Sequence, residues 1–296
     1  MSHSSQPLVS IIMPTYNRAK YIAESIQSVQ SQTYTYWELL IEDDGSDDNT
    51  EDIVNSFTDN RIHYTRHPRT AITGTLRNKA IQRAKGAYIA FMDSDDLWVA
   101  NKLEQQVTLM EQNLAAGFSV TNWCDFRVPG QLESPYHETA NGVTVGNIFR
   151  EHCTADLLFH ITTLIFRKDC VEKTGMFNEN RLFTDYSFMG LLAYYYDAVV
   201  IYKPMLHRRV HAGNSVNASW CEDFEEYQES VHLYLEKGWI NIAIVRQPLF
   251  LSYINLGEKF AGVKDRRRAI KNYLKAWEYK PFSIIPAKKL VKTLFL

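Results

Sequence analysis

The apolar positions of the first 126 residues follow two alternating spacings. Short apolar runs of strand length occupy residues 8–13, 37–41, 61–66, 88–92 and 118–126. Between them, apolar residues recur at helical steps, in segments that cover residues 21–29, 48–57, 73–85 and 101–114. We expect Gly86 to end the third of these helices. Alternating strands and helices predict a parallel sheet with helices on both faces.

The carboxyl ends of these strands should share one edge of the sheet, because crossovers between parallel strands are almost always right-handed. Ligands of open α/β sheets bind at that edge. Three distinctive stretches each follow a predicted strand, namely "PTYN" (14–17), "EDDGSDD" (42–48) and "DSDD" (93–96). Their convergence predicts a ligand site there.

The second half of the chain has a weaker pattern. Residues 128–145 are polar, contain Pro and Gly, and predict an irregular insertion. Residues 157–166 and 199–210 predict strands, and residues 184–196 predict a helix. From residue 219 onward the pattern is helical to the end, so we place a domain boundary near Asn217.

Composition and charge narrow the functional classes. The chain has 296 residues with a net charge of −2, so no overall positive field suggests nucleic acid as a partner. Its four cysteines form no CxxC pair, which argues against a zinc site or a disulfide framework and suits a reducing compartment. We recognise neither a signal peptide nor an apolar run long enough to span a membrane, and therefore expect a cytoplasmic protein.

The chemistry of the predicted edge favours a metal ion. A dinucleotide-binding turn would need glycines after the first strand, yet "PTYNRAKY" contains none, and no GxxxxGK phosphate loop occurs. A divalent cation is the remaining way to hold a diphosphate there. Asp93 and Asp95 offer oxygen ligands that suit Mg²⁺ or Mn²⁺. For "DSDD" alone, a capping turn in a solvated loop remains an equal alternative.

Two long stretches carry a family resemblance. "VSIIMPTYNRAKYIAESIQSVQSQTYTYWELLIEDDGSDDNTEDI" resembles the opening of glycosyltransferase family 2, and "GTLRNKAIQRAKGAYIAFMDSDDLW" resembles its continuation through the metal motif. The resemblance implies an α/β fold of the GT-A type, with a Rossmann-like, mostly parallel central sheet flanked by helices. It also implies inverting transfer of a sugar from a nucleotide-diphosphate donor. The domains would be a glycosyltransferase domain at 1–216, with a nucleotide-binding half at about 1–126 and an acceptor half at about 127–216, and a helical C-terminal extension at 217–296.

The resemblance also implies roles for single residues. The Tyr16 ring would lie against the nucleobase, Asp44 would hydrogen-bond the base, and Arg77 would approach the donor phosphates. Arg209 and His211 belong to "HRRVHAGNS", which resembles a basic loop that closes over the diphosphate. The implied donor-binding residues are Pro14, Tyr16, Asn17, Asp44, Arg77, Asp93, Ser94, Arg209 and His211, and the implied metal ligands are Asp95 and Asp93.

The implied catalytic base is Asp185. "TGMFNENRLFTDYSFMGLL" (174–192) matches the place where the family often shows Glu-Asp at the start of a helix, although Thr184 stands where Glu is common. Asp185 would accept the proton of the acceptor hydroxyl as its oxygen attacks the anomeric carbon. Taken without the resemblance, a carboxylate that favours the helix N-terminus is the better explanation of Asp185.

The tail, "DRRRAIKNYLKAWEYKPFSIIPAKKLVKTLFL", mixes basic and apolar residues. Such a helix either lies on an anionic membrane surface or packs on the catalytic domain. The family's processive polymerases carry a Gln-x-x-Arg-Trp motif and spanning helices, and neither occurs here. We therefore expect one sugar to be added per encounter. The resemblance favours a UDP-sugar as the donor. It also implies a glycan or lipid-linked acceptor in bacterial surface polysaccharide synthesis. The enzyme would be cytoplasmic or peripheral at the inner face of the plasma membrane.

Two other functions remain open from the sequence. A sugar-nucleotide nucleotidyltransferase also combines a metal and a nucleotide on an α/β sheet, but it would usually carry a Gly-rich basic loop after the first strand. A non-catalytic sugar-nucleotide binding subunit would keep the base pocket without needing Asp185.

Overall fold

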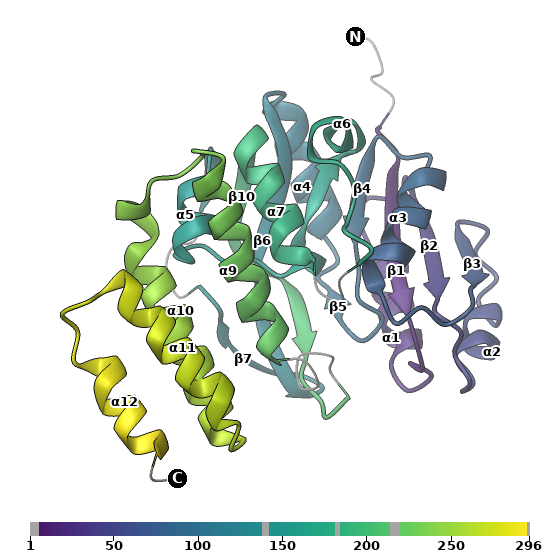
Figure 1. Ribbon diagram of the computed structural model, residues 1–296. Coiled ribbons are helices and arrows are strands. Elements are labelled where there is room, and N and C mark those ends of the chain that lie inside the picture. The colour runs from purple at the N-terminus through teal and green to yellow at the C-terminus, as the bar shows by residue number, and fades with distance from the viewer. Residues whose placement is uncertain (1–5, 138–141, 181–183, 214–219, 295–296) are drawn as a thin grey trace. The chain divides into compact units, whose positions relative to one another are not determined.

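The computed structural model of the protein describes residues 6–137, 142–180, 184–213 and 220–294, which form two compact units (Figure 1). We call residues 1–148 and 159–214 the sheet unit, and residues 149–158 and 215–296 the helical unit. The boundary predicted between residues 216 and 217 falls within residues 214–219, outside the described residues, and stays a prediction.

The sheet unit is built on one 10-stranded sheet. Eight of its strands follow the order β3-β2-β1-β4-β9-β6-β10-β5, and the other two, β7 and β8, pair with β6 and β10. The strands are β1 (Val9–Thr15), β2 (Trp37–Asp43), β3 (Ile62–Arg66), β4 (Tyr88–Phe91), β5 (Leu97–Trp98), β6 (Ala116–Val128), β7 (Gln131–Pro135), β8 (Val143–Gly146), β9 (Ile165–Arg167) and β10 (Asp197–Arg209). All five strands predicted in the first half are present.

The strand directions bring the predicted turns to one edge. Strands β3, β2, β1 and β4 are parallel. Strand β9 is antiparallel to both β4 and β6, so β4 and β6 run the same way, and β10 is parallel to β6. The carboxyl ends of β1, β2, β4, β6 and β10 therefore share one edge, as ligand binding in such sheets requires.

The prediction of an irregular insertion at residues 128–145 is wrong. This stretch contains β7 and the first residues of β8. Residues 131–135 are all exposed, and β7 is held by its ladder with β6. Main-chain hydrogen bonds need no apolar side chains, so an exposed strand can lack the apolar period on which the prediction relied.

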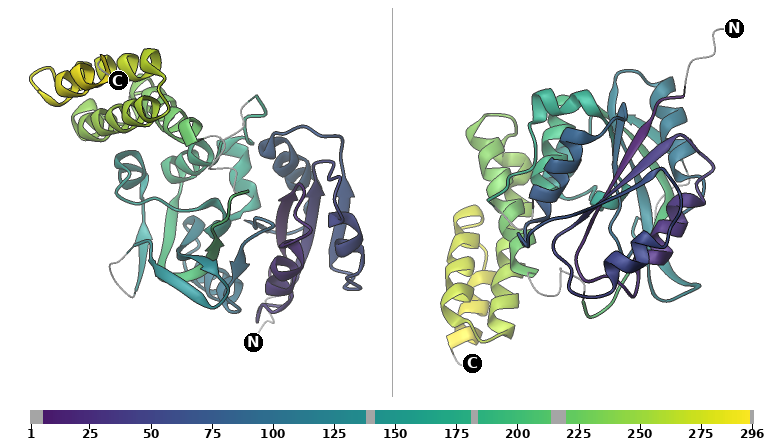
Figure 2. Two further views of the ribbon diagram at one scale, coloured as in Figure 1. Left: turned by 90° about the horizontal axis from the view of Figure 1, so that it is seen from below. Right: turned by 90° about the vertical axis from the view of Figure 1, so that its right-hand side faces the viewer.

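Helices cover both faces of the sheet (Figure 2), and side chains that alternate along the strands pack against them. Val9, Ile11 and Met13 join one buried cluster with apolar residues of α1, α2 and α4, whereas Phe91 points to the other face, where its ring lies 6.4 Å from that of Phe188 in α7. The helices of this unit are α1 (Ile22–Gln30), α2 (Thr50–Asn55), α3 (Thr73–Arg83), α4 (Lys102–Gln112), α6 (Val171–Thr174) and α7 (Asp185–Tyr195), with 3₁₀ turns at Ile161–Thr163 and Lys168–Cys170.

The helical unit confirms the predicted helical extension. Phe250, Phe260 and Tyr273 are buried in its own core, and Gly257 lets the Tyr273 ring approach the helix backbone, because an added Cβ would lie 2.5 Å from that ring. The helices are α5 (Phe149–Thr154), α9 (Trp220–Glu236), α10 (Ile242–Gly262), α11 (Arg266–Tyr279) and α12 (Ile285–Leu294). Among the described residues, no helix is both long enough and apolar enough to cross a membrane.

Gly86 has a different role from the one predicted. Helix α3 ends at Arg83, and Gly86 does not have a positive φ. Its amide donates to Ser10 Oγ at 2.8 Å, and a Cβ at this position would lie 2.5 Å from the Ser10 nitrogen. Space against β1, rather than a left-handed conformation, therefore requires glycine.

We expect Gly86→Ala to destabilise the sheet unit by about 1–3 kcal/mol, the usual cost of overfilling a close-packed site. The free energy of unfolding from chemical denaturation measures this loss. Gly142→Ala is the control, because a Cβ at Gly142 meets no atom within 4 Å. Equal stability of the two variants would contradict the proposed close approach.

Candidate active site

The acidic turn, residues 93–96, begins where β4 leaves the sheet. Ser94, Asp95 and Asp96 are buried, and the Asp96 amide donates to the Asp93 carbonyl at 3.2 Å, which closes the turn. Asp95 and Asp96 thus have little water to screen their charges from each other and from Asp93, whose side chain is 30% exposed, so they need positive or protic partners.

Asp95 contacts two basic side chains from distant segments. Its Oδ2 lies 3.2 Å from Arg18 Nε, in the turn after β1, and 3.0 Å from His211 Nε2, just beyond β10. The Gly213 amide donates to His211 Nδ1 at 3.1 Å, so the imidazole proton is on Nε2 and points toward Asp95. Arg18 Nη2 also donates to the Gly213 carbonyl at 3.1 Å. The predicted basic loop therefore lies against the predicted metal ligand.

Asp96 is the most buried carboxylate of the turn, with 1% of its surface exposed. Its Oδ1 accepts a hydrogen bond of 2.9 Å from the Arg209 amide, and within the described part of the chain its Oδ2 has no hydrogen-bond partner. Burial first, and then the charges of Asp95 and Asp93, raise the pKa of Asp96 well above its ordinary value. A buried carboxylate oxygen without a partner suits a bound cation.

Asp93, Asp96 and His160 place ligand atoms within 4.8 Å of one another. Burial lowers the pKa of His160, which favours the neutral imidazole that binds metals. Two carboxylates and an imidazole are a reasonable ligand set for Mn²⁺. The sequence had suggested Asp95 together with Asp93. In the structure, Asp96 and His160 join Asp93 instead, and the metal role of Asp95 stays a prediction.

Asp185 is the first residue of α7 and lies across Arg77 from the acidic turn. Arg77 Nη1 forms an ion pair with Asp185, and its Nη2 lies 3.7 Å from Asp93 Oδ1. The guanidinium carbon of Arg77 lies 5.3 Å and 5.2 Å from the ring centroids of Phe91 and Phe177. The aromatic rings and the two carboxylates therefore hold Arg77 between the predicted base and a predicted donor residue.

Tyr16 and Asp44, predicted to bind the nucleobase, are connected through one loop. Asp44 accepts hydrogen bonds from the amides of Thr70 at 2.7 Å and Ala71 at 2.8 Å, and it pairs with Arg69. The guanidinium carbon of Arg69 lies 3.5 Å from the centroid of the Tyr16 ring. Residues 69–71 thus tie the turns after β1 and β2 together.

The other predicted donor residues have three kinds of surroundings. Asn17 has a φ of 51° and its amide donates to Ser46 Oγ at 2.9 Å, so it also joins the turns after β1 and β2. Pro14 is buried in β1 and Ser94 in the acidic turn. The guanidinium of Arg209 is engaged with Glu24, at 2.8 Å, and with the Asp95 carbonyl, at 2.9 Å, so here it supports the turn.

Three basic residues of the site were not predicted. Arg18 directly follows "PTYN", so its position in the first turn was a usable signal. Arg69 lies beyond β3 in "RHPRT", where the sequence does not tell which arginine turns back to Tyr16. His160 lies in the stretch 157–166 that was predicted to be a strand, but the structure has a 3₁₀ turn at 161–163 and a strand only at 165–167, and so short a strand has no period that could reveal its neighbours.

Comparisons with known proteins agree with this architecture. The family model "Glycosyl transferase family 2" matches residues 10–175. The chain is 50% identical over 106 residues to UDP-Glc:alpha-D-GlcNAc-diphosphoundecaprenol beta-1,3-glucosyltransferase WfgD of Escherichia coli, a match that covers 36% of this chain and 42% of that relative. It is 29% identical over 245 residues to the uncharacterized glycosyltransferase RP339 of Rickettsia prowazekii, covering 78% of this chain and 72% of the relative. The chain thus spans less than half of the more similar relative.

Solved structures share the fold. The S. aureus TarS fragment 1–349, solved in complex with UDP-GlcNAc, superposes with a TM-score of 0.71 at 17% identity, covering 96% of this chain and 88% of that one. The mannosyltransferase PcManGT of Pyrobaculum calidifontis, solved with GDP-Man and Mn²⁺, gives 0.61 at 16% identity, covering 99% and 87%. These likenesses confirm the predicted GT-A-type α/β fold. Because the family model covers more than half of the sequence, the chain belongs to glycosyl transferase family 2.

Proposed function

We propose that this protein is an inverting glycosyltransferase that moves one sugar from a nucleotide-diphosphate sugar to a glycan or lipid-linked acceptor. The observation that carries the proposal is the placement of Asp185, which is joined through Arg77 to Asp93 at the edge of the sheet. The name of the E. coli relative gives a UDP-sugar donor and a lipid diphosphate acceptor. It supports UDP as the nucleotide and a lipid-linked acceptor.

In this proposal the chain's own residues divide the work. Asp185 accepts the proton of the acceptor hydroxyl while that oxygen attacks the anomeric carbon. Arg77, which the ring faces and the carboxylates hold in place, supplies positive charge near the departing diphosphate. Tyr16 and Asp44 hold the nucleobase, which fixes the donor at the carboxyl ends of β1 and β2.

Asp185→Asn should leave donor binding intact and slow transfer by about 10²–10⁴-fold, because the amide keeps the shape of the side chain but cannot accept a proton. This loss corresponds to about 3–5 kcal/mol of activation free energy. Donor affinity measured by calorimetry and initial transfer rates to a working acceptor test it together. Asp52→Asn, an exposed carboxylate at the start of α2, is the control.

Two outcomes would count against this role. Transfer at the wild-type rate would remove Asp185 from the mechanism and favour a non-catalytic binding subunit. Loss of donor binding would place Asp185 in the donor site, through its ion pair with Arg77.

A divalent cation, Mn²⁺ or Mg²⁺, is part of the proposal. Asp93, Asp96 and His160 fit such an ion, because their ligand atoms lie close together and Asp96 keeps an unpartnered oxygen. The bound ion would supply positive charge that stabilises the diphosphate leaving group. Asp95, paired with Arg18 and His211 in this structure, would take part when those partners move away.

Asp96→Asn should stabilise the metal-free protein at neutral pH. The unfolded chain releases the Asp96 proton near pH 4, whereas burial raises the pKa of Asp96 in the folded protein. The folded form therefore holds more protons, and stability falls as pH rises above about 4. The amide escapes this loss and can still accept from the Arg209 amide.

Thermal unfolding in EDTA at pH 7 and at pH 4 measures the effect of this variant. We expect the higher melting temperature of the variant at pH 7 to approach that of wild type toward pH 4. In a separate measurement without EDTA, Mn²⁺ should raise the melting temperature of wild type only. If the variant is no more stable at pH 7 than wild type, Asp96 is not strained by its burial.

The helical unit offers a surface suited to an anionic membrane, and we include such contact in the proposal. Residues 264–294 hold ten Lys or Arg and two Asp or Glu, a net charge of +8, while the whole chain has −2, so the remainder has −10. Phe282, in the turn between α11 and α12, is 100% exposed, and Ile284 and Ile285 beside it are also exposed. Exposed apolar side chains within a strongly basic segment are typical of interfacial helices.

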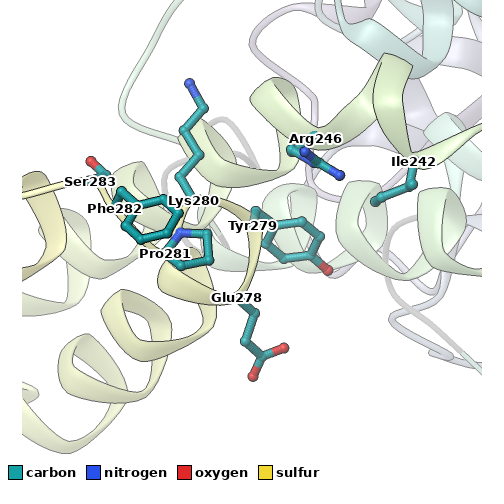
Figure 3. A pocket seen from close by; sticks show the side chains of 8 residues that line it. All are labelled: Ile242, Arg246, Glu278, Tyr279, Lys280, Pro281, Phe282 and Ser283. Atoms are coloured by element: carbon teal, nitrogen blue, oxygen red, sulfur yellow. The ribbon is translucent and has the colours of Figure 1, made fainter.

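The same turn borders an open hollow of ≈ 950 Å³, in which Lys280 and Glu278 point in opposite directions (Figure 3). Arg246 and Tyr279 also line it. The inner side of α12 packs within the unit, with Pro286 and Thr293 buried, while Val291 and Leu294 are exposed. Helix α12 thus packs on its own unit and leaves apolar side chains free for membrane contact, while packing on the catalytic domain stays a prediction.

Phe282→Ala should weaken binding to vesicles of phosphatidylglycerol and phosphatidylcholine by about tenfold, because a Phe side chain leaves water on insertion. Co-sedimentation of the full chain measures this binding, which added salt should reduce. Leu114→Ala, which removes a 74% exposed side chain from the sheet unit, is the control. A wild-type protein that ignores anionic vesicles would rule out membrane contact.

A further inference from the structure

Four aromatic side chains of the sheet unit form a continuous row, which we call the aromatic wall: Trp123, Tyr136, His137 and Phe159. The rings of Trp123 and Tyr136 are stacked, with centroids 4.1 Å apart and planes 16° from parallel. His137 meets both of them edge-on, at 5.9 Å and 5.0 Å, and Phe159 lies 5.4 Å from His137. The wall combines a residue in the middle of β6, the two residues after β7 and the approach to the 3₁₀ turn at 161–163.

His160 connects the aromatic wall to the candidate active site. Its ring lies 6.3 Å from that of Trp123, and its ligand atom is within 4.8 Å of those of Asp93 and Asp96. Asp185 also acts electrostatically on His160. The wall therefore begins one side chain away from the carboxylates of the site.

The wall presents an apolar face beside charged groups. Tyr136 is 51% exposed, whereas Trp123 beneath it is buried. Arg208 donates to both carboxylate oxygens of Asp125, at 2.8 Å and 2.6 Å, and both of these side chains are partly exposed. Asp125 lies two residues beyond Trp123 on β6, so both side chains are on one face of the strand, and Arg208 is its partner on β10, next to Arg209, whose amide donates to Asp96.

We propose that the aromatic wall binds a pyranose ring of the acceptor glycan. The C–H groups on one side of a pyranose carry partial positive charge and suit the negative face of an aromatic ring. The hydroxyl edges can hydrogen-bond to the Asp125–Arg208 pair. The inference rests on the proposed function, since it explains how an acceptor hydroxyl would be presented to Asp185.

The nucleobase is a less suitable occupant of this wall. The Tyr16 ring, Asp44 and Arg69 already form an aromatic and polar set in the turns after β1 and β2. If the pyranose binds at the aromatic wall, Tyr16, Asp44 and Arg69 remain available for the nucleobase of the donor. It also keeps the acceptor beside the acidic turn, where transfer would occur.

Tyr136→Ala should raise KM for the acceptor by about three- to tenfold, from the loss of one aromatic contact. The acceptor probe is a short-chain alkyl diphosphate of α-GlcNAc, and its KM is measured. The affinity for UDP-glucose and the rate of its slow hydrolysis by water are measured in parallel. Donor affinity and hydrolysis should not change. Tyr136→Phe keeps the ring face and should restore acceptor KM to within about twofold.

Tyr36→Ala is the matched control, because Tyr36 is 50% exposed but precedes β2, at the opposite edge of the sheet. Phe159→Ala tests the other end of the wall and keeps the inference testable if Tyr136→Ala fails to fold. Unchanged acceptor KM in a folded Tyr136→Ala and in Phe159→Ala would overturn the inference. A wild-type protein that neither binds nor hydrolyses any UDP-sugar would instead overturn the proposed function.

Discussion

The mutual repulsion of Asp93, Asp95 and Asp96 is the constraint on which the rest of the site depends. Buried carboxylates in one turn are unfavourable unless positive or protic groups lie among them. The groups that meet this need come from segments far apart in the chain. Arg18 follows β1, while Arg209 and His211 come from the end of β10. The partners that stabilise the acidic turn are therefore brought together only when the sheet unit folds.

The same charges that stabilise the turn are suited to a phosphorylated ligand. Arg18 and Arg77 neutralise carboxylates here and His211 donates a hydrogen bond to one, and guanidinium and imidazole donors also match phosphate oxygens. If the proposed function is right, donor and cation arrive together and these partners are exchanged rather than lost. Such an exchange keeps the total charge of the site nearly constant, which limits the cost of desolvation on either side.

Charged groups and exposed aromatic groups are concentrated on different segments of the chain. The turns after β1, β2 and β4 carry the charged groups, whereas the aromatic wall and the exposed turn at Phe282 carry aromatic surface. Charged contacts give orientation and depend on salt, while aromatic contacts depend mainly on the area removed from water. A protein that transfers a sugar from a nucleotide diphosphate to an amphipathic acceptor would use both kinds of surface.

The sequence by itself determined the local elements of the first 126 residues and the edge at which the distinctive turns meet. The apolar periods of 3.6 and 2 residues are local properties, and the handedness of crossovers converts their order into a shared edge. Only the tertiary structure decided that β9, three residues long, enters between β4 and β6, and that His160 thereby approaches Asp93. It also decided that Arg18 and Arg69, among 32 basic residues, reach Asp95 and Tyr16. The physical reason is that such partnerships depend on distances set by the order of strands in the sheet, which a local pattern of side chains does not record.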